Sequence, residues 1–210
     1  MNNLRRILSS AKNSIKLQFI IEHYLRLAGF TQFAVNGMVF EAKRGEPPAF
    51  AIGAQILNYP IGLIYVSEGL MNHLPEEELE FVVLHEMAHI LNNHLISNLL
   101  VLLGKGYLTD VLADILDVSY KEAQDVIGLI KLLWMLFTRQ KTIEEEITAQ
   151  MELEADKYAV SLQGKKEPAI SFFLKASREN IKAPTHVTVT GRFVLPALSF
   201  EERINALRNL

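Results

Sequence analysis

Apolar residues recur at helical spacing near the start of the chain. Leu4, Ile7, Leu8, Ala11 and Ile15 are spaced so that they share one face of a helix. This pattern predicts an amphipathic N-terminal helix that packs on the rest of the domain. Attachment of this face to a membrane surface is the alternative interpretation.

The segment from residue 30 to 67 carries the alternating pattern of strands instead. Asn36-Gly37 lies between two alternating runs within 32–42, which predicts a tight hairpin at this dipeptide. The runs 49–55 and 62–67 predict two further strands, joined around Asn58-Tyr59-Pro60. We therefore expect a small, mostly antiparallel sheet of three or four strands.

Helical patterns follow the sheet. Pro75 suits the first position of a helix, and the acidic residues 76–78 complement the positive end of its dipole. This helix is expected to continue to about His94.

Three later helices are indicated by a Ser or Thr followed three residues on by Glu, the pattern of a capping box. These patterns begin at Ser119, Thr142 and Ser199 and predict helices over 120–138, over 142–163 and at the C-terminus. Because strands precede helices and no repeat or linker interrupts the chain, we expect a single α+β domain over residues 1–210.

Composition narrows the classes of function. A net charge of −3 does not provide the basic surface that nucleic-acid binding requires. There is no cysteine, so disulfides are excluded and any metal must bind His, Asp or Glu. The N-terminus lacks the apolar core of a signal peptide, and no stretch reaches the roughly 20 apolar residues of a membrane span. We expect a cytoplasmic protein, with peripheral membrane contact as the alternative.

The helix expected after Pro75 contains His85-Glu86-x-x-His89. Residues four apart lie one turn apart on the same face, so both imidazoles can bind one metal ion. Glu86 lies about 100° around the helix from His85, where its carboxylate can take a proton from a metal-bound water. The surrounding helix is apolar on nearly all sides, and burying these polar groups there is costly unless a metal satisfies them. This pattern predicts a catalytic zinc site.

A third ligand is expected from the helix that follows Thr142. Glu152 and Asp156 are four residues apart, so Glu152 can bind zinc while Asp156 accepts the free N–H of a ligand histidine. Glu154 projects about 200° away and cannot share that role. A solvated acidic helix face is the alternative interpretation of these carboxylates.

Two residues near the end of the first metal-binding helix have ordinary interpretations. His94 is predicted to lie about 140° around the helix from His89, away from the ligand face, as a structural or surface residue. Asn93 is expected on the cleft side, where it bonds substrate or a ligand, or simply ends the helix.

The run from Ala49 to His94 and the segment Glu152-Leu-Glu-Ala-Asp156 together resemble the HtpX and CAAX-prenyl-protease type of gluzincin metallopeptidases. The resemblance covers 49–94 and 145–163 well, and the C-terminal helix moderately. Two motifs in the right order and spacing make it specific.

This resemblance implies one zinc ion per chain, held by His85, His89 and Glu152, with Glu86 as general base and Asp156 behind the site. It also implies an edge strand above the cleft over 49–55, with which an extended peptide would pair by main-chain hydrogen bonds. Residues of that strand are Ala49, Phe50, Ala51, Ile52 and Gly53.

The chain departs from the family pattern near its C-terminus. Family members usually carry His-Pro before the last helix, whereas this chain has Leu195-Pro196. His186, Arg203 and Tyr158 are candidates for stabilising the tetrahedral intermediate in place of that histidine. The ordinary alternatives are an exposed loop position for His186 and a pairing with a carboxylate for Arg203.

The region between the two zinc motifs is the second departure. Many family members have transmembrane helices there, but the apolar runs 95–103 and 126–137 are too short, and 104–125 is too polar to lie in lipid. We expect residues 95–141 to form a helical insert beside the cleft.

These observations predict a zinc metalloendopeptidase that hydrolyses unfolded or extended polypeptides. The alternative is a non-catalytic, zinc-stabilised binding module or a latent, regulatory protease-like protein. The general base at Glu86 argues against that alternative, because a structural metal site does not use one.

Overall fold

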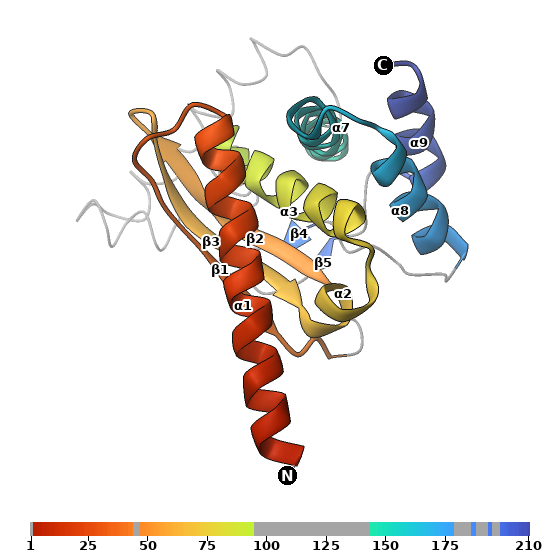
Figure 1. The fold of residues 1–210 in the computed structure, drawn as a ribbon. Coiled ribbons are helices and arrows are strands. Elements are labelled where there is room, and N and C mark those ends of the chain that lie inside the picture. The colour runs from red at the N-terminus through yellow and green to blue at the C-terminus, as the bar shows by residue number, and fades with distance from the viewer. Residues whose placement is uncertain (1, 44–46, 95–142, 179–185, 188–192, 195–197) are drawn as a thin grey trace, which may run out of the picture. The chain divides into compact units, whose positions relative to one another are not determined.

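The computed structural model describes residues 2–43, 47–94, 143–178, 186–187, 193–194 and 198–210 (Figure 1). The chain divides into two compact units, one formed by 1–95 and 149–210 and the other by 96–148. The first unit holds the candidate site. The insert expected over 95–141 and the helix expected over 120–138 lie outside the described residues.

Helices and strands follow one another as an α+β fold, as the sequence predicts. The helices are α1 (Asn2–Leu27), α2 (Glu68–His73), α3 (Glu76–Leu91), α7 (Ile143–Gln163), α8 (Glu167–Arg178) and α9 (Phe200–Arg208). The strands are β1 (Ala34–Phe40), β2 (Ala49–Ile56) and β3 (Tyr59–Ser67), with a separate short antiparallel pair of β4 (His186–Val187) and β5 (Phe193–Val194).

The three-stranded sheet has the order β1-β3-β2. β2 and β3 form an antiparallel hairpin, whereas β1 pairs in parallel with β3. The sheet is therefore mixed, and the prediction of a mostly antiparallel sheet is wrong for the β1 ladder. β2 lies at one edge of this sheet, where one side of its backbone is not paired with β3.

The hairpin predicted at Asn36-Gly37 is also wrong, because both residues lie inside β1. Gly37 is needed there for close packing against α1: a Cβ on it would lie 2.6 Å from Cγ of Leu17. The tight turn lies instead between β2 and β3, at Leu57 and Asn58, whose φ angles are +49° and +64°. Two consecutive left-handed residues are typical of the turn that closes a two-residue hairpin.

Gly37→Ala is expected to lower the free energy of unfolding by about 1–3 kcal/mol, because the added methyl group overpacks the contact with α1. Gly69→Ala is the matched control: a Cβ there meets nothing closer than 3.8 Å, and alanine favours the helix α2. Urea unfolding followed by circular dichroism measures both. Equal midpoints for the two variants would show that α1 does not need the glycine.

α1 and α3 cover the same face of the sheet (Figure 1). The N-terminal helix is confirmed, but its packed stripe is formed by Leu17, Ile21 and Leu25, which are fully buried. Ala11 and Ile15, which we expected on the packed face, are exposed, Ile15 by 71%. Gly37 of β1 allows α1 to approach the sheet closely at Leu17 and Ile21.

α3 runs through the middle of the unit and packs on β2, β3, α1 and α8. Apolar residues on nearly all its sides are buried, as expected for a central helix. It ends at Leu91 rather than near His94, because Asn93 has a left-handed φ of +57° that no helix continues.

α7 and α9 confirm the helices predicted from Thr142 and Ser199, and the capping box of Ser199 and Glu202 is present. α2 and α8 were not predicted. α8 is fixed to α3 by Ser171 and Lys175, whose side chains donate to Glu78 at 2.7 and 2.6 Å. Among the helices that the structure describes, none is long and apolar enough to cross a membrane.

Candidate metal centre

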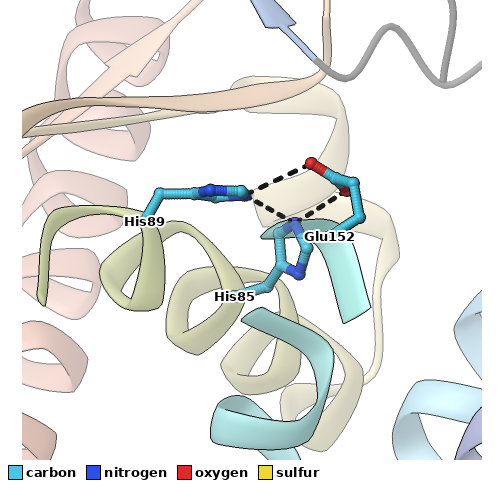
Figure 2. Close-up of side chains that lie close together, drawn as sticks. All are labelled: His85, His89 and Glu152. Atoms are coloured by element: carbon cyan, nitrogen blue, oxygen red, sulfur yellow. Dashed lines mark hydrogen bonds and ion pairs between the residues drawn. The ribbon is translucent and has the colours of Figure 1, made fainter. Parts of the chain in front are cut away.

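The central helix α3 carries both histidines of the first motif. His85 and His89 lie one turn apart, and their Nε2 atoms are 3.1 Å from each other (Figure 2). Both side chains point away from the helix toward α7, so the two lone pairs are directed at the same small volume.

The opposing helix α7 supplies the carboxylate. Glu152 is 1% exposed, and its oxygens lie 3.4 Å from Nε2 of His85 and 3.5 Å from Nε2 of His89 (Figure 2). These three side chains form a group that could hold a metal ion. The structure thus brings together the residues expected as ligands.

Asp156, one turn after Glu152, orients the first histidine. Its Oδ1 accepts a hydrogen bond from Nδ1 of His85 at 2.9 Å. Arg203 of α9 donates to the same carboxylate through Nε at 2.7 Å and through Nη2 at 2.6 Å. Asp156 is fully buried and its oxygens only accept, so Nδ1 of His85 carries the proton and Nε2 is left to bind a metal.

Arg203 also contacts the carboxylate of Glu152, with Nη1 3.0 Å from its Oε2. Its guanidinium is buried and stacks on the ring of Phe173, 4.4 Å from the ring centroid. Arg203 therefore pairs with carboxylates, as the alternative to a role in stabilising the intermediate predicted. These ion pairs fix α9 to α7 behind the site.

The expectation that His94 lies away from the ligand face is wrong. α3 ends three residues before it, so helical spacing no longer applies. His94 is 3% exposed, and its Nδ1 lies 2.8 Å from Nδ1 of His89. In the sequence, the asparagines at 92 and 93 indicate where α3 ends, because asparagine readily adopts the left-handed conformation that ends a helix.

Asn93 contacts the edge strand of the sheet. Its Oδ1 accepts a hydrogen bond from the backbone N–H of Gln55 in β2 at 2.7 Å. The turn after α3 is thereby tied to the edge strand.

The charges around the group favour a cation. Burial disfavours protonated His85, but the bonds and charges of Asp156 and Glu152 outweigh it and raise the pKa of His85 to about 10. Burial alone would raise the pKa of Glu152, yet Arg203 and the two histidines hold it well below its usual range. A buried carboxylate that stays ionised beside two imidazoles is a suitable place for a metal cation.

Glu86 lies beside this group on α3. Burial raises the pKa of Glu86 to about 7, although His85, Arg203 and a backbone hydrogen bond from Ala51 each lower it. A pocket adjoins Glu86, and most of its wall is apolar. It is lined by Pro48, Ala49, Leu70, Phe81, Val82, His85, Glu86, Glu152, Phe172, Phe173, Phe200 and Arg203.

The remaining candidates occupy different places. Tyr158 is partly buried and packs against the hydrophobic core, and burial raises its pKa. His186 lies in β4. Leu195-Pro196 lies outside the described residues.

The donor set fits a metal ion. Each imidazole has its Nδ1 engaged by a neighbour, and the two Nε2 atoms face the carboxylate oxygens of Glu152. Bringing lone pairs together in this way is unfavourable unless a positive charge, a proton or a metal ion, lies among them.

The family follows from a comparison of the whole sequence. The profile of peptidase family M48 matches residues 11–210. The chain belongs to this family. M48 proteins are metallopeptidases, and the group of His85, His89 and Glu152 is where this chain could bind its metal.

Relatives with the name "Protease HtpX homolog" are similar to this chain. That of Variovorax paradoxus is 28% identical and covers 79% of this chain, and that of Polaromonas naphthalenivorans is 26% identical and covers 97%. That of Acidovorax ebreus is 28% identical and covers 79%. The chain spans 63%, 75% and 62% of the lengths of these relatives, respectively. No solved structure gives a significant match.

Proposed function

We propose that this protein is a zinc-dependent endopeptidase that hydrolyses extended or unfolded polypeptides. The observation that carries the proposal is the approach of two imidazole nitrogens, 3.1 Å apart, to one carboxylate: Oε2 of Glu152 lies 3.4 Å from Nε2 of His85, and its Oε1 lies 3.5 Å from Nε2 of His89. Zinc holds nitrogen and oxygen ligands at roughly 2.0–2.2 Å in a tetrahedron, for which neighbouring ligands lie about 3.3 Å apart. The separations therefore suit zinc, and three protein ligands leave one position for water.

Zinc bound at this site would polarise the peptide carbonyl and lower the pKa of its water. The protein's part is to receive the proton of that water on Glu86 and to pass it to the leaving amine. Glu86 is adjacent to His85 on α3 and lines the pocket, so its carboxylate faces the space in which the scissile bond would lie.

Substrate binding is proposed along β2. The N–H of Gln55 bonds Asn93, and Ala51 bonds Glu86, so the backbone of these odd-numbered residues points away from β3. Gly53 shares this direction because strand residues alternate. An extended peptide that pairs with this edge would pass Glu86, and the adjoining pocket would receive an apolar side chain.

The residue that stabilises the tetrahedral intermediate is still known only as a prediction. Arg203 is engaged by Asp156 and Glu152, so it would act through the charge it already places behind the site. His186 and Tyr158 are the other candidates.

Zinc content and proteolysis test the proposal. The purified protein is expected to hold about one zinc per chain and to cleave unfolded casein, to lose cleavage when a chelator removes the metal, and to regain it when zinc returns. A zinc-loaded protein that cleaves nothing in a broad peptide library would favour a binding module. Protein that takes up no zinc at all would refute the proposed site.

A further inference from the structure

A short turn after α3 returns the chain to the ligand His89. Asn93 adopts a left-handed φ of +57°, and the next residue, His94, is thereby placed against His89. The two rings meet nearly edge to face, with centroids 4.9 Å apart and Nδ1 atoms 2.8 Å apart. His94 is more deeply buried than His85, with 3% of it exposed against 8%.

The chemistry of the pair assigns the proton between them. Nε2 of His89 faces His85 and Glu152, so it is the atom available to a metal, and its Nδ1 must then carry the hydrogen. Nδ1 of His94 is the atom within reach, and it accepts that hydrogen as a neutral imidazole. The proton of His94 then lies on its Nε2.

The far side of His94 meets an acidic residue of α7. Nε2 of His94 lies 3.5 Å from Oε2 of Glu154, whose side chain is 47% exposed. This is an ion-pair distance, and among the described residues no hydrogen bond reaches that nitrogen. Glu154 thus faces the proton that His94 must carry on Nε2 when its Nδ1 accepts. One nitrogen of the His94 ring thus faces a hydrogen-bond donor, the N–H of His89, and the other faces an acceptor, the carboxylate of Glu154.

We propose that His94 is a positioning residue for the metal: it holds His89 in the orientation and tautomer that direct Nε2 at the ion, with Glu154 holding His94 in turn. Nδ1 of His89 thereby donates to an imidazole, just as Nδ1 of His85 donates to the carboxylate of Asp156. The inference rests on the proposed metal site. Partners of this kind typically change metal affinity about ten- to a hundredfold when removed.

Two substitutions separate the hydrogen-bond acceptor from the bulk of the ring. His94→Leu keeps an apolar side chain of similar volume and removes the acceptor. His94→Asn places Oδ1 the same number of bonds from Cα as Nδ1, so it restores the acceptor. His73→Leu is the matched control, because His73 is an exposed histidine of α2 that bonds only the carbonyl oxygen of Gly69 among the contacts described.

Competition with a chromophoric zinc chelator measures the affinity of each full-length variant. We expect His94→Leu to bind zinc about ten- to a hundredfold more weakly than wild type, His94→Asn to recover most of that loss, and His73→Leu to match wild type. Thermal unfolding of the metal-free proteins checks that the losses do not follow from misfolding.

The outcomes distinguish the inference from the proposed function. Wild type that binds zinc only as tightly as His94→Leu would overturn the role of His94 while leaving the site intact, and wild type that binds no zinc would overturn both. Equal weakening in His94→Asn and His94→Leu would show that the acceptor is not the cause. Nitrogen-15 spectra of the zinc-bound protein give an independent reading, since the Nδ1–H of His89 is expected to be protected in wild type and exchanging in His94→Leu.

Discussion

Glu86→Gln is expected to bind zinc as wild type does and to hydrolyse peptides about 10²–10⁴-fold more slowly. The amide keeps the size of the side chain and can still accept a bond from the backbone of Ala51, so the fold and the ligands are undisturbed. It cannot receive a proton from water. Zinc content by atomic emission and initial rates on an unfolded protein substrate measure the two properties on one preparation.

His89→Ala is the companion variant. It removes a nitrogen ligand from a group of three, so both the metal and the activity are expected to fall. A Glu86→Gln protein that retains wild-type rates would exclude Glu86 as the general base. Loss of zinc in that variant would instead show that Glu86 supports the ligands.

The grouping of the candidate ligands was predictable because much of its geometry is local. His85 and His89 are one turn apart on a single helix, and Glu152 and Asp156 are one turn apart on another, so spacing alone places each pair on one face. Only the approach of α7 to α3 is a tertiary fact. The residues alone left a solvated acidic face as the alternative for Glu152 and Asp156, and the family resemblance favoured the ligand role. The capping box at Ser199 is equally local, and it too is confirmed.

The errors arose where tertiary packing or the end of a helix decided the outcome. Gly37 has the sequence context of a turn, yet it serves the contact with Leu17, which no short-range pattern reveals. His94 was placed by extending a helix that Asn93 ends. β1 pairs in parallel with β3, and the antiparallel hairpin is formed by β2 and β3. The pairing of β1 depends on contacts across the whole sheet, which a short-range pattern does not reveal.

Arg203 is the buried cation that joins the C-terminal helix to the candidate metal site. It bonds Asp156 through two nitrogens and lies 3.0 Å from Glu152, and both carboxylates are almost fully buried. Burial alone would lower the pKa of Arg203, but the charges of Asp156 and Glu152 raise it above its usual range. Arg203 therefore remains charged at every pH at which the protein is folded. Removing it leaves two carboxylates buried beside each other without their cation.

Arg203→Met is expected to lower the free energy of unfolding of the metal-free protein by about 3–5 kcal/mol. Methionine preserves the apolar contact with Phe173, so the loss reports the charge rather than the packing. Arg208→Met, on the exposed face of the same helix, should change stability by less than about 0.5 kcal/mol. Urea unfolding of the three metal-free proteins measures the difference. A loss no greater for Arg203→Met than for Arg208→Met would mean that water or a bound proton neutralises the carboxylates, and that Arg203 does not hold the C-terminal helix to the metal site.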